Sequence, residues 1–181
     1  NKTVLVPDLE AGCSLVSGTP TDKFRQWRLS RPNAVAVTYI NSSTEVKALS
    51  DVICTSSNAE KIIRSIPEDR EILFAPDRNL GRFIEKKTGR KMILWEGACE
   101  VHVLFSAQML EGLKRKYPDA LVLAHPECEE AVLAYADVIG ATSTLLAATT
   151  NKAYKKFIVV TEEGIIHQMQ KARPDAEFIP A

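Results

Sequence analysis

Short apolar runs recur along the chain and alternate with segments whose apolar residues return every three to four positions. The runs are rich in valine and isoleucine, which is typical of buried strands, whereas the longer segments are typical of helices. We predict strands at residues 3–7, 34–40, 51–54, 72–75, 137–139 and 157–160. A further strand starts at Ile93, and another ends at His125. We predict helices at residues 22–29, from Ser42 or Ser43 to about 49, 59–66, and 80–87 with Gly89 at its end.

The alternation of strands and helices indicates the fold class. Consecutive parallel strands need a crossover connection, usually a helix that packs on the sheet. The pattern therefore predicts an α/β protein made of tandem three-layer αβα domains with short parallel sheets.

A shift of 86 positions relates the two halves of the chain. The equivalent positions are Cys13 and Cys99, Tyr39 and His125, Asn41 and Glu127, Ser56 and Thr142, 51–53 and 137–139, and 71–74 and 157–160. Such a gap-free shift predicts two copies of one unit. We expect the repeats at residues 17–101 and 102–181, with residues 1–16 ending a missing N-terminal domain. Because the chain starts at Asn1 without a methionine, we expect a piece of a longer protein.

Polar residues at the predicted strand ends differ between the two copies. In open parallel sheets, ligands bind at the carboxyl ends of the strands. Tyr39 and Asn41 offer a phenol and an amide that can orient a polar ligand, whereas His125 and Glu127 can move protons near neutral pH. This asymmetry favours a catalytic site. The alternative is that Tyr39 and His125 only cap their strands through backbone hydrogen bonds.

Ser56 and Thr142 are expected at helix N-cap positions, where a hydroxyl accepts a hydrogen bond from a free backbone amide. The functional alternative is that the two helix N-termini bind the carboxylates or phosphate of a substrate. The two interpretations are compatible, because a capping hydroxyl can also donate to an anion.

Cys13 and Cys99 are expected on equivalent turns before helices, a setting that favours the thiolate. A single cysteine is more often a core residue, and Cys54 is predicted to be one, with Cys128 a weaker candidate for the site. His102, three positions after Cys99, is expected to face the same side of its helix. Two thiolates cannot saturate a metal, but a [4Fe–4S] cluster with three leaves one iron open as a Lewis acid. The repeat places a third cysteine just beyond Ala181.

Composition restricts the possible partners. The chain has 181 residues, 45% of them hydrophobic, which suffices for a sizeable core. Its 23 basic and 23 acidic residues balance, so we expect neither nucleic acid nor a membrane surface as a partner. The sequence has no signal-peptide pattern and no run long enough for a membrane span, so the cytoplasm is the expected compartment. Its four cysteines are then thiols or metal ligands.

A set of motifs spans almost the whole chain: Pro7-x-x-x-x-Gly12-Cys13-Ser14, Tyr39-x-Asn41, Cys54-Thr55-Ser56-Ser57-Asn58, Pro76-Asp77-x-x-Leu80-Gly81, Trp95-x-Gly97-x-Cys99-x-x-His102, His125-Pro126-Glu127-Cys128, Gly140-x-Thr142-Ser143 and Thr161-Glu162-x-Gly164. In these motifs and their order, the chain resembles the quinolinate synthase (NadA) family. The resemblance implies three αβα domains around a pseudo-threefold axis, each giving one cysteine to a [4Fe–4S] cluster. Ala141 departs from the serine of many members.

The resemblance also implies an activity and a set of site residues. Family members condense iminoaspartate with dihydroxyacetone phosphate to quinolinate in NAD biosynthesis, and L-aspartate oxidase or aspartate dehydrogenase would supply the iminoaspartate. Cys13 and Cys99 would be two cluster ligands. The substrate-binding residues would be Tyr39, Ile40, Asn41, Ser56, His125, Pro126, Glu127 and Thr142. Among them we expect Glu127 to act as general base or acid, with His125 and Tyr39 also catalytic.

The fragment alone is expected to be inactive, because the third cysteine and one domain are absent. Two alternatives remain open. The chain could be a non-catalytic αβα module that binds a small anion, or part of a different iron–sulfur hydro-lyase.

Overall fold

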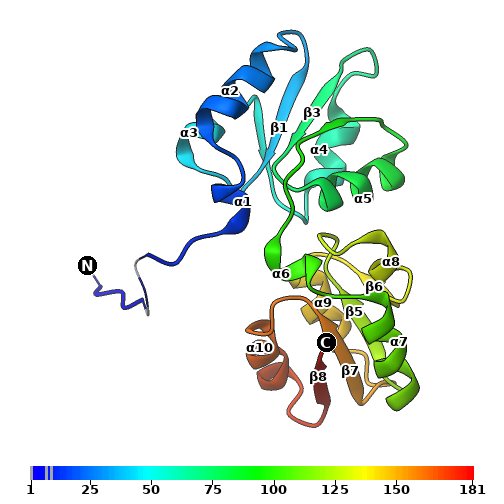
Figure 1. Cartoon of the computed structure of the whole chain (residues 1–181). Coiled ribbons are helices and arrows are strands. Elements are labelled where there is room, and N and C mark those ends of the chain that lie inside the picture. Colours follow the sequence, from blue (N-terminus) through cyan, green and yellow to red (C-terminus); the bar gives the residue numbers. More distant parts are fainter. Residues whose placement is uncertain (1, 7, 9) are drawn as a thin grey trace.

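A computed structural model describes residues 2–6, 8 and 10–181, and it contains two parallel four-stranded sheets (Figure 1). The first sheet has the order β2-β1-β3-β4 and consists of β1 (Val35–Tyr39), β2 (Val52–Cys54), β3 (Ile72–Ala75) and β4 (Ile93–Leu94). The second has the order β6-β5-β7-β8 and consists of β5 (Leu121–Ala124), β6 (Val138–Ile139), β7 (Lys156–Val160) and β8 (Glu177–Pro180). The predicted α/β class with tandem parallel sheets is confirmed.

Helices cover both faces of the first sheet. The helices of this unit are α1 (Ser14–Ser17), α2 (Thr21–Leu29), α3 (Thr44–Ala48), α4 (Ala59–Ser65) and α5 (Arg78–Thr88). Leu15, Ile63 and Leu80 bring α1, α4 and α5 into one buried cluster with the sheet. Phe24 and Val46 bring α2 and α3 into another, with Ala75 of β3. Apolar side chains thus project from both faces of the sheet, as is expected of a sheet that is buried between two layers of helices.

The second sheet repeats this arrangement. Its helices are α6 (Glu100–Val103), α7 (Ala107–Lys116), α8 (Glu130–Leu133), α9 (Thr142–Ala148) and α10 (Ile165–Ala172). Leu110 of α7 and Val132 of α8 pack with Val122 and Ile158 on one face. Leu145 of α9 and Met169 of α10 pack with strand residues on the other face. No helix among the described residues is long and apolar enough to cross a membrane.

The repeat is not gap-free, which corrects the expectation drawn from the sequence. Val35 of β1 pairs with Ile72, and Leu121, 86 positions after Val35, pairs with Phe157, only 85 positions after Ile72. The connection before β7 is therefore one residue shorter than the one before β3. Surface connections tolerate such changes in length, because they carry few packing contacts.

Two predicted strands are also corrected. Residues 3–6 form no regular structure and are exposed, because no described strand lies beside them to pair with their backbone; Pro7 falls outside the described residues. The strand from Ile93 is real but short and only half-buried, since β4 is the edge of its sheet.

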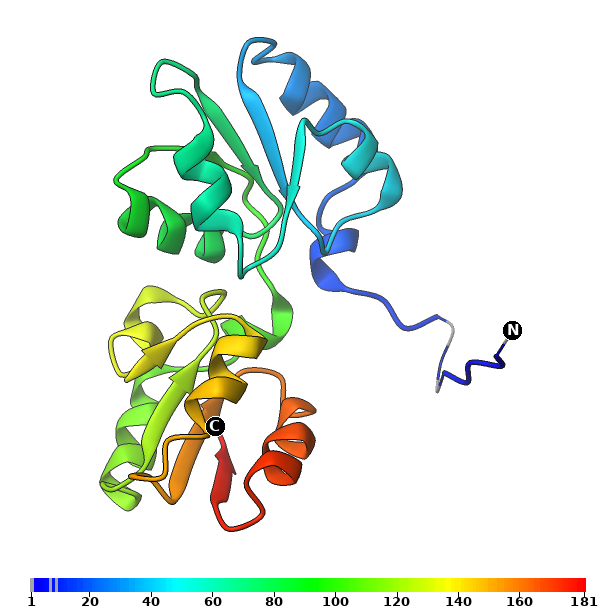
Figure 2. The ribbon, with the colours of Figure 1, turned by 180° about the vertical axis from the view of Figure 1, so that it is seen from behind.

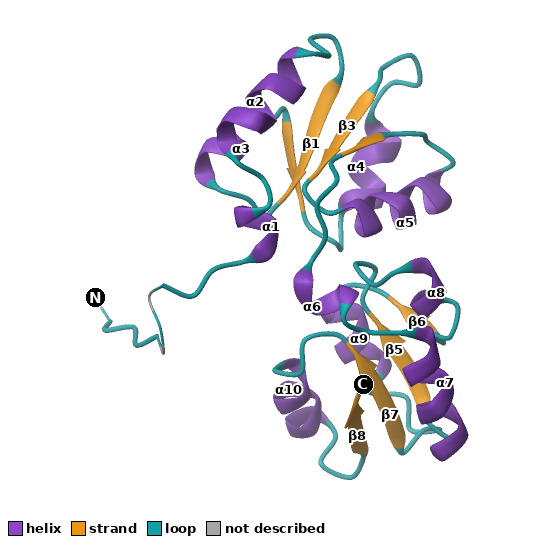
Figure 3. Cartoon of the chain, viewed as in Figure 1, coloured by secondary structure: helices purple, strands orange, loops and turns teal. Residues whose placement is uncertain are grey.

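The loops that follow the strands of the two sheets meet between the units, where α6 connects them (Figure 2). Asn79, which follows β3, donates a hydrogen bond to the backbone oxygen of Glu127, which follows β5. Figure 3 shows these loops between the two sets of strands. Because both sheets are parallel, all their strands end at this junction, and it is the place where a ligand is expected.

Candidate active site

Cys13 and Cys99 occupy equivalent positions at the starts of two short helices. Cys13 is the N-cap of α1 and Cys99 the N-cap of α6, and both are half-buried against the same core cluster. The backbone N–H of Glu100 donates to Ser14 Oγ at 2.9 Å. The two helix starts are therefore in direct contact, and each presents a free thiol at the junction.

The other two cysteines belong to the cores. Cys54 is completely buried, and Cys128 is buried with its Sγ 3.5 Å from the backbone oxygen of Val160. Burial raises the pKa of each thiol to about 12, so both stay protonated at neutral pH. Neither is suited to be a ligand that must lose its proton.

His102 joins the first helix turn after Cys99 to a buried carboxylate. Its Nδ1 lies 3.1 Å from Glu127 Oε2, and its Nε2 lies 2.9 Å from Thr161 Oγ1. Burial by itself lowers the pKa of His102, but Cys99 and the Glu127 carboxylate raise it to about 9. Burial raises the pKa of Glu127, but His102 and His125 outweigh it and hold that pKa below its usual range. Near neutral pH the arrangement is an imidazolium beside a carboxylate.

His125 lies beside the same carboxylate, but its imidazole is neutral, whereas that of His102 is protonated. Its ring stacks on that of His102 with centroids 4.8 Å apart, and its Nδ1 accepts a hydrogen bond from the backbone N–H of Glu127. Burial lowers the pKa of His125 to about 4, and the charge on His102 adds to this effect. The accepting Nδ1 places the proton of the neutral ring on Nε2, where it can be donated to a ligand.

Tyr39, at the end of β1, completes the group. Its pKa is raised far above its usual range, first by burial and then by the nearby Glu127 carboxylate, while Ser56 acts in the opposite direction. The phenol is therefore protonated at any physiological pH and acts as a hydrogen-bond donor. The structure thus brings Tyr39, Ser56, His125 and Glu127 together from the ends of three strands.

The remaining predicted residues lie outside this group. Asn41 and Thr142 are exposed, and no side-chain hydrogen bond in the described part of the chain joins them to it. Ile40 is also exposed, whereas Pro126 is buried between His125 and Glu127. Whether these four residues contact a substrate stays a prediction.

The expected capping roles are wrong. The N-cap of α4 is Asn58, and that of α9 is Ala141, so Ser56 lies before its helix and Thr142 is already its first residue. Helix starts depend on the backbone conformation of a few residues, which a cluster of polar residues does not specify. The hydroxyl of Ser56 consequently interacts with Tyr39 rather than with a helix.

Three further residues lie at the junction without having been assigned a site role from the sequence: Asp77 and Thr161, which stand in two of the motifs, and Asn79. Asp77 is completely buried and accepts hydrogen bonds from the backbone N–H groups of Leu80 and Cys99. Burial raises its pKa to about 6. The strand-end rule indicates Asp77 and Thr161, which follow β3 and β7, but it does not indicate Asn79, which lies within α5.

The donor atoms at the junction fit a metal group. Cys99, His102 and Glu127 each offer one ligand atom within 4.8 Å of the others. Glu127 Oε1 is buried without a hydrogen-bond partner, and His102 Nδ1 has only its ion pair with Glu127 Oε2, so the carboxylate keeps an oxygen that a bound group or substrate can satisfy. Cysteines are the usual ligands of iron–sulfur clusters, and Cys13 leads the helix start that is hydrogen-bonded to that of Cys99. The residues present therefore fit the cluster that the cysteine spacing predicts.

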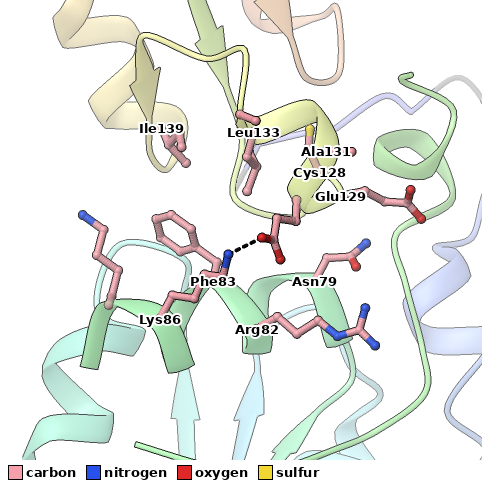
Figure 4. A pocket seen from close by; sticks show the side chains of 12 residues that line it. Asn79, Arg82, Phe83, Lys86, Cys128, Glu129, Ala131, Leu133 and Ile139 are labelled. Atoms are coloured by element: carbon pink, nitrogen blue, oxygen red, sulfur yellow. Dashed lines mark hydrogen bonds and ion pairs between the residues drawn. The ribbon is translucent and has the colours of Figure 1, made fainter. Parts of the chain in front are cut away.

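A cavity of about 560 Å³ opens beside this group, between the two units (Figure 4). One wall is the side of α5 that carries Arg82 and Lys86, and the other includes Cys128 and Glu130. Lys86 pairs with Glu130 across it. None of Tyr39, His125 or Glu127 lines this cavity, so it is separate from the cluster of titratable residues.

Comparison with known proteins decides the family. The model of the family described as quinolinate synthetase A protein matches residues 1–181. The chain belongs to the quinolinate synthetase A (NadA) family. It is 55% identical over 181 residues to quinolinate synthase of Chloroherpeton thalassium, covering 100% of this chain and 56% of that protein. It is 53% identical over 180 residues to the Synechocystis sp. enzyme, covering 99% of this chain and 57% of that protein.

The same comparisons show how much of the length of its NadA relatives this chain covers. A third relative, quinolinate synthase of Thermosynechococcus vestitus, is 54% identical over 181 residues, which are 57% of its length. The chain thus spans little more than half of the curated NadA relatives that it matches.

Proposed function

We propose that the protein containing this chain is a quinolinate synthase, which condenses iminoaspartate with dihydroxyacetone phosphate to give quinolinate in NAD biosynthesis. One observation carries the proposal beyond family membership. The starts of α1 and α6, each led by a free cysteine, are hydrogen-bonded to each other next to a buried group of Tyr39, His102 and Glu127.

Cys13 and Cys99 would hold two irons of a [4Fe–4S] cluster, and the third cysteine would come from outside residues 1–181. When bound, such a cluster supplies an open iron that acts as a Lewis acid toward substrate oxygen or nitrogen. The proton transfer and the orientation of the substrate are assigned to side chains of this chain.

Glu127 is the proposed proton acceptor. Its carboxylate is ionised at neutral pH, because His102 and His125 lower its pKa, and its Oε1 has no hydrogen-bond partner. His102 keeps this carboxylate ionised and in place, since the raised pKa of His102 keeps the imidazole protonated and Thr161 fixes the other ring nitrogen. The reaction releases phosphate and water and removes protons from carbon, so both a proton acceptor and proton donors are needed.

Tyr39 and His125 are the proposed donors that orient the substrate. Both carry a proton at neutral pH, the phenol because its pKa is raised and the imidazole on Nε2 because Nδ1 accepts a hydrogen bond. Neutral donors can bind carboxylate and carbonyl oxygens without a proton transfer. Ile40, Asn41, Ser56, Pro126 and Thr142 complete the proposed substrate-binding set.

The experiment uses the full-length protein, purified without oxygen and supplied with iminoaspartate and dihydroxyacetone phosphate. We expect quinolinate as the product and the brown colour of an iron–sulfur protein. Cys13→Ser and Cys99→Ser should each abolish colour and turnover, whereas Cys54→Ala, the matched control in the core, should keep both.

Two outcomes would overturn the proposal. A colourless wild-type protein that binds dicarboxylates equally well in the Cys13→Ser and Cys99→Ser variants would be a small-anion binding module. A brown protein that forms no quinolinate would be a different iron–sulfur hydro-lyase. The cytoplasmic location and supply of iminoaspartate by L-aspartate oxidase or aspartate dehydrogenase stay predictions.

A further inference from the structure

The turn between β3 and α5 contains a motif, Pro76-Asp77-x-x-Leu80-Gly81, that the proposed chemistry does not use. Asp77 is completely buried there. Its Oδ1 accepts a hydrogen bond from Leu80 N–H at 2.7 Å, which caps α5, and its Oδ2 accepts one from Cys99 N–H at 2.8 Å. One carboxylate therefore caps a helix and fixes the backbone of a cysteine 22 positions away.

Backbone contacts bring the segment before Cys99 against the same turn. Arg78 N–H donates to the oxygen of Gly97 at 2.8 Å, and Asp77 and Gly97 form a parallel bridge. A Cβ atom on Gly97 would lie 2.4 Å from the backbone oxygen of Pro76, closer than real Cβ atoms approach. This close approach requires glycine, and it leaves the loop little freedom to move away from Asp77.

Asn79, two residues after Asp77, reaches into the second unit. It is 6% exposed, and its Nδ2 donates to the backbone oxygen of Glu127 at 3.1 Å. Figure 4 shows the Asn79 side chain directed from α5 toward the segment that carries Cys128 and Glu129. The same turn thus contacts the residues on both sides of the junction.

We infer that the turn Pro76–Leu80 is a positioning element, in which Asp77 sets the position of Cys99 and Asn79 sets that of Glu127. The inference rests on the proposed function for the roles of Cys99 and Glu127, but not for the contacts themselves. Asp77 and Asn79 act through the backbone groups of Cys99 and Glu127 that they contact. The opposing interpretation is that Asp77 only caps α5 and Asn79 only fills space.

Asp77→Asn separates positioning from capping. Asparagine is as good a helix cap as aspartate, so its oxygen can still accept from Leu80, but its NH₂ group cannot accept from Cys99 N–H. The alkylation rate of Cys99 is followed by peptide mass spectrometry in iron-free full-length protein. We expect this rate to rise about tenfold in the variant, because a charge-assisted hydrogen bond to the backbone of Cys99 is lost. Cys13, measured in the same sample, should change less than about twofold, which makes it an internal control.

Ser106→Ala is the matched control variant. Ser106 also accepts a backbone hydrogen bond at a helix start, from Met109 N–H of α7, but it contacts neither cysteine. It should leave both alkylation rates unchanged. The inference is overturned if Cys99 reacts in Asp77→Asn as it does in wild type, or if Cys13 and Cys99 accelerate together, which would indicate general loosening. This measurement needs no turnover, so it stands even if the proposed function fails.

Asn79→Leu tests the second contact, because leucine keeps the volume and removes the donor. We expect kcat with iminoaspartate and dihydroxyacetone phosphate to fall about tenfold while KM changes less than about twofold, as for a group that acts only in the transition state. The pH profile of kcat should shift, and iron content and Cys99 alkylation should not. Loss of iron together with activity, or an unshifted profile, would overturn the role of Asn79.

Discussion

The buried, neutral imidazole of His125 predicts that acid destabilises this protein through one identifiable side chain. Burial lowers the pKa of His125 from its ordinary 6.5 to about 4. Between these values the unfolded chain binds a proton at this position and the folded chain does not. The contribution of His125 to the free energy of unfolding is therefore highest above pH 6.5, and it falls as the pH drops toward 4.

The size of the effect follows from the shift. A difference of roughly 2.5 pKa units at about 1.36 kcal/mol each corresponds to about 3 kcal/mol, of which about 2 kcal/mol is lost by about pH 5. His125→Asn removes the titrating ring, and the Oδ1 of asparagine can still accept the hydrogen bond that Nδ1 accepts from Glu127 N–H. From neutral pH to about pH 5, the variant should lose about 2 kcal/mol less stability than wild type.

Urea unfolding of the iron-free protein, followed by circular dichroism at several pH values, measures this difference. Carboxylates that His125 does not influence cancel when the variant is compared with wild type, and Glu127, whose pKa lies below its usual value, stays ionised over this range. His167→Asn is the matched control, because His167 is exposed on α10 and should follow wild type. If the curves of wild type and His125→Asn stayed parallel down to about pH 5, the imidazole would not be buried and neutral, and the reasoning would be refuted.

Two further predictions concern the proton acceptor and the close approach at Gly97. Glu127→Gln keeps the shape of the side chain but cannot exchange a proton. In the full-length protein we therefore expect turnover to fall about 10²–10⁴-fold while the iron content stays unchanged. Activity within a few-fold of wild type would exclude Glu127 as the base. Gly97→Ala should lower the melting temperature, because its Cβ would lie 2.4 Å from the oxygen of Pro76. A Cβ atom on Gly112 of α7 would have no neighbour within 4 Å, so Gly112→Ala should raise the free energy of unfolding by up to about 1 kcal/mol. Equal thermal stability of the two variants would contradict the geometry.

Much of the fold could be predicted because its signals are local. Ser43 caps α3 by accepting from Val46 N–H, and Gly89 ends α5 with a φ of 73°, as their residue types indicate. The gathering of Tyr39, His125 and Glu127 was also predictable, since parallel strands end at one edge. The 86-position shift made Cys13 and Cys99 equivalent, and both stand at the starts of helices.

The partners within the site could not be predicted, because they depend on how the two units pack. Sequence reasoning paired Glu127 with His125, but His102 approaches the carboxylate more closely, at 3.1 Å against 3.8 Å. Asn79 and Glu127 are 48 positions apart and belong to different sheets. No periodicity relates such residues, so the contact appears only once the junction has formed.

The two kinds of contact at the junction have different origins. The bond from Glu100 N–H to Ser14 Oγ joins positions that the repeat makes equivalent, so duplication of one unit suffices to bring two cysteine-led helix starts together. The Asn79 contact and the His102 pair join positions that are not equivalent, and they required the copies to diverge. Glu127 depends on Tyr39 and Asn79 of the first unit as well as on His102 of its own, so the second unit by itself would leave the carboxylate without two of its partners. The acid–base group is therefore a property of the joined units, and neither copy of the repeat could have carried it alone.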